Sequence, residues 1–243
     1  MIISIHKASL ILKELSKHYP ESVSLDEISK QTGISKSTCV QMLNTLIHET
    51  LAERTKYARY ALGAGCFYLT RSGKFDKKNI EICRPVLNWL QGKTGETAII
   101  SQIRSGEKYN VDFCIGNYKL QNNNDDISLD SVYSTAAGRV ITAHCSFDEL
   151  CDIIERHSLP TKEQWKDFSN ISEFEEELEH IRSKPYISVE REHTIGFAAP
   201  LFSNDRIFGA IGLAVKSDNR KSDEEYTKYL LKAAKEINRR LNF

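Results

Sequence analysis

Apolar residues recur at helical spacing on both sides of a glycine in the stretch LDEISKQTGISKSTCVQMLNTL, residues 25–46. Ser24 predicts the N-cap of a short first helix, because Glu27 follows at the position that closes a capping box. Gly33 supplies a tight turn, since glycine adopts a left-handed backbone at no steric cost. Ser35 is placed to cap a second helix. The pattern predicts a helix-turn-helix.

The second helix has two faces of different chemistry. Helical spacing directs four apolar side chains to the core: Cys39, Leu43, Leu46 and Ile47. The opposite face carries short hydrogen-bonding groups and one cation: Lys36, Ser37, Val40, Gln41 and Asn44. Such groups suit phosphates and base edges in a major groove. Helical bundles that bind no nucleic acid also contain helix-glycine-helix segments, and their polar faces are only solvated.

A basic hairpin after the second helix strengthens the interpretation as a DNA-binding domain. Two short runs, 51–54 and 59–62, are joined by the tip Thr55-Lys56-Tyr57-Ala58. They predict a β-hairpin wing whose cations reach phosphate or the minor groove. The expected DNA contacts are Ser35, Lys36, Ser37, Thr38, Val40, Gln41, Asn44, Arg54, Lys56, Tyr57 and Arg59.

The remaining pattern predicts an α+β protein built on an antiparallel sheet. Helices are expected at residues 3–18, 63–70, 75–93, 134–144, 147–157, 161–168, 171–183 and 223–241. Strands are expected at residues 97–104, 108–115, 186–190, 196–203 and 206–216. Pro85 should kink or divide its helix, and the polar run 121–126 predicts a loop. The expected domains are a head (1–73), a linker helix (74–95) and a C-terminal domain (96–243), with the boundary at 71–74.

Charge divides the chain unevenly. The net charge is zero over all 243 residues. Residues 1–78 hold nine Lys and three Arg against two Asp and five Glu, a net charge of +5, so the remainder carries −5. A basic head on an acidic body fits DNA binding, although +5 is modest and favours a dimer that doubles the phosphate contacts.

Other functional classes find little support. The six cysteines form no C-x-x-C pair, so we expect buried thiols and no metal or cofactor. His144 and Cys145 are neighbours in a predicted helix and would point about 100° apart, which disfavours a catalytic pair. No segment has the apolar length of a membrane span, and the charged N-terminal helix does not resemble a signal peptide. We expect a cytoplasmic protein that is not an enzyme.

Several separated motifs, in order, resemble the isocitrate-lyase-regulator-type (IclR) family of transcription factors over nearly the whole chain. The motifs are LDEISKQTGISKSTCVQML with RYALG (59–63), RPVLNWLQGKTGETA (84–98), STAAGRVITA (134–143), GFAAPLF (196–202) and GAIGLAV (209–215). The resemblance implies a winged helix-turn-helix head, a linker helix and a GAF-like C-terminal effector-binding domain. It also implies homodimers or homotetramers on double-stranded operator DNA, with a small organic, sugar or aromatic acid as effector. Family members repress or activate, and we expect a repressor.

The effector site is expected around a small-residue loop at a helix N-terminus, where free N–H groups can bind a carboxylate. The predicted residues are Ser134, Thr135, Ala136, Ala137, Gly138, Glu190, Gly196, Gly212 and Ala214. The last three come from matching the family motifs. Glu190 or Glu192 would replace the family's acidic contact, and Gln41 stands where many members have Arg. The small residues alternatively only let the helix pack closely on the sheet, and Arg139 either pairs with the acid or lies in solvent.

The resemblance also implies a mechanism, in which ligand binding shifts the sheet against the linker helix. The two heads of a dimer would then change their spacing on a palindromic operator. The alternative functions are an enzyme, and a winged-helix module for protein interaction or dimerisation without a small-molecule ligand.

Overall fold

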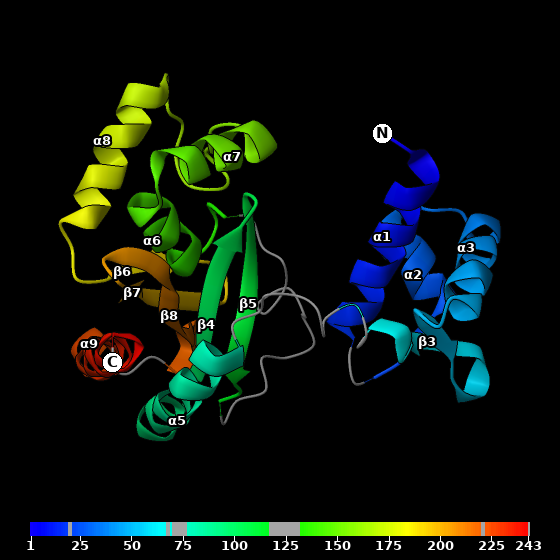
Figure 1. The fold of residues 1–243 in the computed structure, drawn as a ribbon, viewed down its shortest axis with the longest axis horizontal. Coiled ribbons are helices and arrows are strands. Elements are labelled where there is room, and N and C mark those ends of the chain that lie inside the picture. The colour runs from blue at the N-terminus through cyan, green and yellow to red at the C-terminus, as the bar shows by residue number, and fades with distance from the viewer. Residues whose placement is uncertain (19–20, 67–68, 70–76, 117–131, 220–221, 243) are drawn as a thin grey trace. The chain divides into compact units, whose positions relative to one another are not determined.

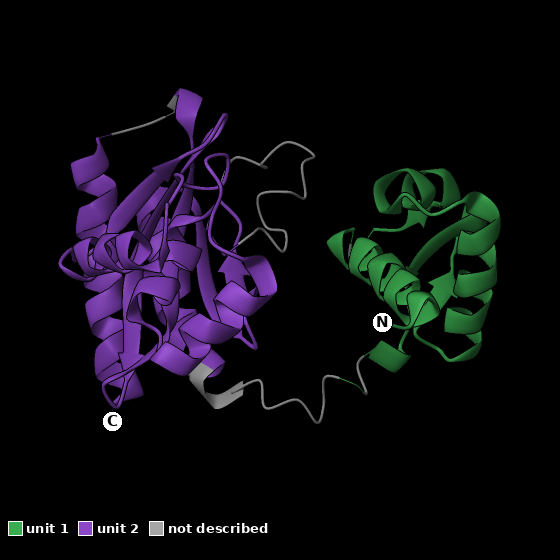
Figure 2. Ribbon diagram, turned by 90° about the horizontal axis from the view of Figure 1, so that it is seen from above, with its two compact units in different colours: residues 1–75 green, residues 76–243 purple. Residues whose placement is uncertain are grey.

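The computed structural model describes residues 1–243 except 19–20, 67–68, 70–76, 117–131, 220–221 and 243. The chain forms two compact units, residues 1–75 and residues 76–243 (Figure 2). The predicted domain boundary at 71–74 and the predicted loop at 121–126 lie outside the described residues, as does part of the helix predicted at 63–70.

Unit 1 is a winged helix-turn-helix. Its elements are α1 (Ile3–Lys17), β1 (Val23–Ser24), α2 (Leu25–Thr32), α3 (Lys36–His48), β2 (Ala52–Arg54), the 3-10 turn η1 (Lys56–Ala58) and β3 (Arg59–Leu62). The three short strands pair in the order β1-β3-β2, so β3 lies between the strand that precedes α2 and the strand that follows α3. The two-residue strand β1 was not predicted from the sequence.

Local signals in the sequence place the two central helices. Ser24 and Glu27 form a complete capping box at the start of α2. Gly33 ends α2 in the left-handed conformation, with φ of 68°. The Ser35 side chain accepts a hydrogen bond from the N–H of Thr38 and so caps α3. The predicted helix-turn-helix is confirmed.

Unit 2 is built on a five-stranded antiparallel sheet of order β5-β4-β8-β7-β6. The strands are β4 (Thr97–Arg104), β5 (Glu107–Cys114), β6 (Ile187–Glu190), β7 (Thr194–Ser203) and β8 (Arg206–Lys216). The helices are α5 (Lys77–Thr94), α6 (Ala136–His144), α7 (Phe147–His157), α8 (Ile171–Arg182) and α9 (Asp223–Leu241), and the 3-10 turn η3 spans Ser217–Asn219. The predicted α+β architecture is confirmed.

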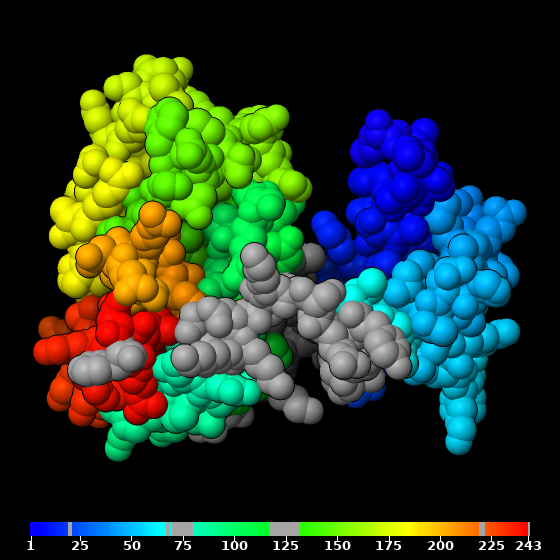
Figure 3. Space-filling model, viewed as in Figure 1, coloured from blue at the N-terminus to red at the C-terminus, as the bar shows by residue number. Residues whose placement is uncertain are grey.

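Helices cover both faces of this sheet (Figure 1). α5 and α9 lie side by side over one face, which carries large apolar residues such as Phe197, Ile211 and Leu213 (Figures 1 and 3). α6, α7 and α8 cover the other face, where Ala198 and Ala210 belong to the core. Because side chains alternate along a strand, β7 and β8 present large residues to α9 and small residues to α6.

One expectation about helices is wrong. Residues 161–168 form a single turn rather than a helix, because the Gln164 carbonyl, which a helix would pair with the N–H of Phe168, accepts a bond of 2.9 Å from Arg139 Nη2. Of the two outcomes expected at Pro85, a kink or a break, the break does not occur: α5 continues through Pro85 as one element. None of the helices in the described parts of the chain combines the length and apolar composition that a membrane span needs.

Candidate functional sites

The exposed face of α3 carries polar side chains at consecutive helical turns. Lys36, Ser37, Gln41 and Asn44 are exposed, whereas Thr38 and Val40 are half-buried. Cys39, Leu43 and Leu46 hold the opposite side of α3 in the core, and Ile47 packs against that core. The core contacts therefore fix the direction in which Gln41 and Asn44 project.

Two side chains at the start of α3 have partners inside unit 1. Ser35 Oγ caps the helix and lies 2.9 Å from Thr38 Oγ1. Lys36 Nζ lies 2.9 Å from Asp26 Oδ1 on α2, and both side chains are more than half exposed. An ion pair so exposed contributes little to stability, so a phosphate group can compete for the Lys36 ammonium.

The wing presents three of the predicted contacts to solvent. Arg54, Lys56 and Tyr57 are exposed, and Tyr57 is 93% exposed at the tip, which projects from the surface of unit 1 (Figure 3). Tyr57 has a left-handed backbone, with φ of 64°. The N–H of Thr55 donates to the carbonyl of Arg59 over 2.8 Å and closes the tip. The tip thus holds an aromatic ring and cations away from the domain core.

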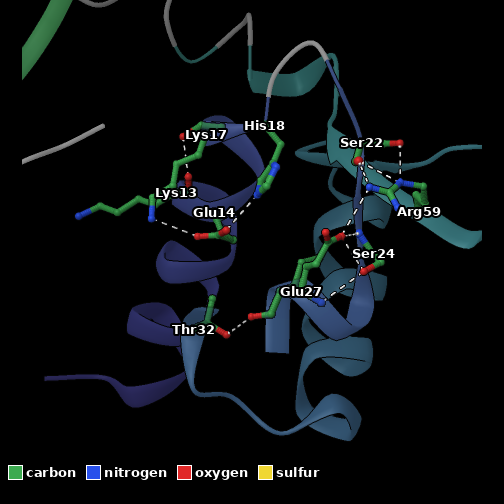
Figure 4. Close-up of polar contacts among 11 residues, drawn as sticks. Lys13, Glu14, Lys17, His18, Ser22, Ser24, Glu27, Thr32 and Arg59 are labelled. Carbon is green, nitrogen blue, oxygen red and sulfur yellow. Dashed lines mark hydrogen bonds and ion pairs between the residues drawn. The ribbon is translucent and has the colours of Figure 1, made fainter. Parts of the chain in front are cut away.

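The guanidinium of Arg59 is bound within unit 1 (Figure 4). Its Nε donates to the carbonyl of Ser22 over 2.9 Å, and its Nη2 lies 3.5 Å from Glu27 Oε2. Glu27 in turn closes the capping box of α2 with Ser24. Arg59 therefore connects the wing strand β3 to the start of α2 and the segment before β1.

Replacing Arg59 with Met should lower the stability of unit 1 by about 1 kcal/mol, because the hydrogen bonds of the guanidinium to Ser22 and its ion pair with Glu27 are lost from a partly exposed site. Both tryptophans, Trp89 and Trp165, belong to unit 2. The Tm of unit 1, followed by circular dichroism, should therefore fall. The Tm of unit 2, followed by tryptophan fluorescence, should stay unchanged. If Arg59 binds phosphate instead, the Arg59→Met variant would release about one counterion fewer than the wild type on binding DNA, and its affinity would depend less steeply on salt.

A pocket in unit 2 opens between the N-terminus of α6 and the sheet. The cavity volume between its walls is about 70 Å³. Seven of the nine predicted effector residues line it: Ser134, Thr135, Ala136, Ala137, Gly196, Gly212 and Ala214. Residues far apart in the sequence thus meet around one cavity.

The first turn of α6 faces this pocket. Thr135 is the N-cap, and its Oγ1 accepts a hydrogen bond of 3.1 Å from the N–H of Gly138. A helix has no carbonyl of its own for the N–H groups of its first turn, here those of Ala136 and Ala137. Their small side chains let a ligand approach the backbone, and the helix dipole favours an anion there.

Gly138 and Glu190 do not line the pocket. A Cβ atom on Gly138 would lie 1.9 Å from the carbonyl oxygen of Val132, so this glycine permits close packing of the chain against α6. On β6, Val189 is buried and Glu190 is exposed, and it is Val189 that lines the cavity. Because side chains alternate along a strand, Glu190 lies on the opposite face, outside the site. Glu192 is exposed beyond the end of β6.

A polar wall of the same pocket was not predicted from the sequence. Ser101, Lys108 and Asn110 line it from β4 and β5, and Arg191 and Thr194 line it near β6 and β7. Lys108 and Asn110 are two residues apart on β5, and side chains two residues apart along a strand share a face. This spacing is the signal in the sequence that could have placed both on one face. Among the described lining residues there is no Asp or Glu, so the charged side chains of the pocket are cations.

Arg139 follows neither of the two expectations for it. Its Nε donates to the carbonyl of Tyr133 over 2.7 Å, and its guanidinium carbon lies 4.6 Å from the ring centre of Trp165. Burial lowers the pKa of Arg139 to about 10. This side chain attaches the turn at 161–168 to α6 and supports the helix from behind the pocket.

The pair His144–Cys145 lacks the features of a nucleophile and base. Burial, with the nearby Glu149 carboxylate, raises the pKa of Cys145 to about 12. The thiol donates to the carbonyl of Thr142 over 3.1 Å, and burial also lowers the pKa of His144. A thiol in this state is a poor nucleophile at neutral pH.

A winged helix-turn-helix joined to a pocket-bearing α+β unit defines a class of protein, the DNA-binding transcription regulators with an effector domain. Sequence comparison gives the family: "Bacterial transcriptional regulator IclR C-terminal" matches residues 76–241, and the "IclR helix-turn-helix domain" matches residues 4–56. The chain belongs to the IclR family of transcriptional regulators. None of the curated proteins compared with the chain matches it.

Solved structures share the fold over the full length. The Thermotoga maritima IclR is 22% identical with a TM-score of 0.63, and an IclR transcriptional regulator from Alicyclobacillus acidocaldarius is 19% identical with a TM-score of 0.67; each match covers 100% of both chains. An IclR homologue from Microbacterium hydrocarbonoxydans in complex with 4-hydroxybenzoate is 15% identical with a TM-score of 0.67, over 98% of both chains. At these identities the likeness establishes the fold alone.

Proposed function

We propose that this regulator binds a palindromic operator through α3 and the wing of unit 1. Gln41 and Asn44 are the proposed base contacts, because their amides can each pair with an adenine edge in the major groove. Lys36, Arg54 and Lys56 are the proposed phosphate contacts, with Ser35, Ser37, Thr38, Val40 and Tyr57 completing the surface. The exposure of these residues on one helix face and one hairpin supports the proposal.

The proposed effector is a small organic, sugar or aromatic acid that binds in the pocket of unit 2. The observation that carries this proposal is the first turn of α6, which opens into a cavity whose charged lining residues are Lys108 and Arg191. The carboxylate would accept hydrogen bonds from the N–H groups of Ala136 and Ala137. The 4-hydroxybenzoate bound to the Microbacterium homologue is an acid of this class, which lends support.

The proposed response is repression that the effector modulates in the cytoplasm. α5 packs on the sheet whose strands carry the pocket, so a ligand that moves the strands can move this helix. In a homodimer or homotetramer, such a movement would change the spacing of two DNA-binding heads, and with it the affinity for two operator half-sites.

Replacing Gly196 with Val should abolish acid binding without unfolding the protein. A Cβ atom at this position meets Ala136 Cβ at 3.7 Å, an ordinary contact, so the valine methyl groups would occupy the cavity rather than clash with backbone. Valine also suits a strand. The test is a thermal-shift screen of the full chain against small carboxylates, sugar acids and aromatic acids, followed by tryptophan fluorescence.

A ligand at about 100 times its Kd adds about 2.7 kcal/mol to stability, a shift of several degrees in Tm. The shift should be retained in Glu190→Gln, because Glu190 lies outside the pocket, and lost in Gly196→Val. A shift that both variants keep would place the ligand elsewhere. Absence of any shift in the wild type would favour a C-terminal unit that only mediates protein contacts.

A further inference from the structure

A solvent-exposed aromatic ring lies at the tip of the wing. Tyr57 is 93% exposed, whereas Tyr60, three residues later, is 7% exposed and belongs to the core of unit 1. Burial of an aromatic ring is among the larger contributions that one side chain makes to the stability of a domain. At this exposure the ring of Tyr57 makes no such contribution to unit 1.

The backbone at this ring adopts a conformation that suits other residue types better. Tyr57 has φ of 64° and ψ of 30°, and the next residue, Ala58, has φ of 54°. Both lie in the left-handed region, which is costly for most residues with a Cβ atom and is favoured by glycine and asparagine. The core of unit 1 explains neither the exposed ring nor this backbone. Strained backbone of this kind clusters at binding sites.

Hydrogen bonds hold the tip in place. The N–H of Thr55 donates to the carbonyl of Arg59 over 2.8 Å, and the Thr55 hydroxyl donates to the same carbonyl over 3.3 Å. Arg59 Nε in turn donates to the carbonyl of Ser22 over 2.9 Å. The ring of Tyr57 is therefore presented on a short, anchored turn, which limits the conformational entropy lost when the ring binds a partner.

The charge around the ring indicates that this partner is DNA. Residues 54–59, RTKYAR, contain three cations and no acidic residue, and Arg54 and Lys56 are exposed. Such a tip suits the sugar–phosphate backbone. β2 begins at Ala52, shortly after α3 ends at His48. When α3 lies in a major groove, the wing therefore meets the DNA beside that groove.

The width of the minor groove decides which part of the wing can enter it. The major groove, about 12 Å wide, admits a two-stranded ribbon, but the minor groove is only about 6 Å wide. A single side chain at the tip can fit there. Ala58 is too short, and the Thr55 hydroxyl is bonded to the backbone of the turn. Lys56 can stay with the phosphates at the rim, which leaves the ring of Tyr57 to enter the groove.

We propose that Tyr57 wedges between two base pairs from the minor groove and kinks the operator at that step. This inference rests on the proposed DNA-binding function of α3 and the wing. Apolar side chains that enter the minor groove partly unstack the bases and bend the duplex. The cost is lowest at pyrimidine–purine steps such as TA and CA, which deform easily. The operator therefore carries such a step at a fixed distance from each sequence that α3 recognises.

The test varies one step of the DNA together with one side chain of the wing. The full chain selects an operator from random double-stranded DNA, and energy transfer between dyes at the two DNA ends measures the bend. We expect the bound operator to be bent by at least about 20° and to carry a pyrimidine–purine step beside each half-site. Replacing these steps with AA should weaken binding by the wild type about tenfold or more.

Variants at the tip separate the ring from the turn and from the charge. Tyr57→Asn removes the ring, and because asparagine adopts the left-handed backbone more readily, the Tm of unit 1 should not fall. This variant should bind the original and the AA-substituted operator equally and leave both nearly straight. Tyr57→Phe should keep the bend and the step preference. Lys56→Ala, the matched control, should bind more weakly because it loses a phosphate contact, yet bend the DNA as the wild type does.

A bend and a step preference that persist in Tyr57→Asn would overturn the wedge while leaving operator binding in place. Loss of both in Tyr57→Phe would assign them to the hydroxyl group and overturn the wedge as well. If the full chain selects no sequence from the random DNA, the proposed DNA-binding function would be overturned too.

Discussion

Replacing Gly138 with Ala is expected to destabilise unit 2 by at least about 2 kcal/mol, because it forces an extra methyl group into packed backbone. The added Cβ would lie 1.9 Å from the carbonyl oxygen and 2.7 Å from the carbonyl carbon of Val132. Neither atom is the end of a flexible side chain, so α6 or the chain before it must move. The measurement is denaturant unfolding followed by the fluorescence of Trp89 and Trp165, which both report on unit 2.

The matched control is Gly92→Ala in α5 of the same unit. A Cβ built at Gly92 meets no atom within 4 Å beyond its chain neighbours and the backbone of its own helix, and Gly92 is exposed near the end of α5. This substitution should raise stability by about 0.5–1 kcal/mol, because alanine forms helix better than glycine. If both variants shifted the unfolding midpoint alike, the close approach of Val132 to α6 would not be a constraint.

Small residues in this segment have two different structural roles. In STAAGRVITA, Ala136 and Ala137 line a cavity, whereas Gly138 is small because a backbone carbonyl lies against it. Composition alone cannot separate these roles, since both require the absence of a large side chain. The separation depends on Val132, whose position relative to α6 no local pattern specifies.

Local signals were sufficient where a short segment determines its own structure. The capping box of Ser24 and Glu27 and the left-handed Gly33 specify the turn of the helix-turn-helix within ten residues. The strands β4, β7 and β8 were predicted to within two residues at each end, because turns with positive φ flank them at Ser105-Gly106 and Asn204-Asp205. These signals do not depend on distant parts of the chain.

Tertiary contacts explain what the sequence could not show. A helix was expected at 161–168, yet Trp165 and Phe168 both pack on Phe174 and Arg139 takes the Gln164 carbonyl. The wall of Ser101, Lys108 and Asn110 was missed for a related reason. A β-bulge between Ile100 and Ser101 shifts the pairing with β5, so Asp112 faces α5 and pairs with Arg84 while Asn110 faces the pocket.

The register of β5 and β6 decides on which face of the sheet Lys108 and Glu190 lie. A one-residue change in register moves a side chain to the other face of a sheet. Val189 pairs with Gly196 and faces the pocket, which leaves Glu190 outside it. The charge of the pocket therefore depends on which residues of β5 and β6 point inward, and these include a lysine but not the expected glutamate.

Replacing Gln41 with Ala is expected to weaken binding to the operator by about tenfold to a hundredfold while leaving binding to unrelated DNA unchanged. Gln41 is exposed in the middle of α3, and a bidentate contact between an amide and a base discriminates by about 1–3 kcal/mol. Lys56→Ala should weaken binding to both DNAs, with a salt slope smaller by about 0.9 per head, because a phosphate contact carries no sequence information.

The measurement begins with selection of an operator from random double-stranded DNA by the full chain. Affinities of the wild type and variants for the selected and a scrambled sequence are then compared at several salt concentrations. Gln31→Ala, which removes an exposed amide from α2, serves as the control. It should keep the wild-type ratio of the affinity for the selected sequence to the affinity for the scrambled sequence. If the Gln41→Ala variant also keeps this ratio of affinities, the centre of α3 does not recognise the bases. Loss of the ratio in Gln41→Ala, with an altered salt slope confined to Lys56→Ala, would assign base recognition to the helix and phosphate binding to the wing.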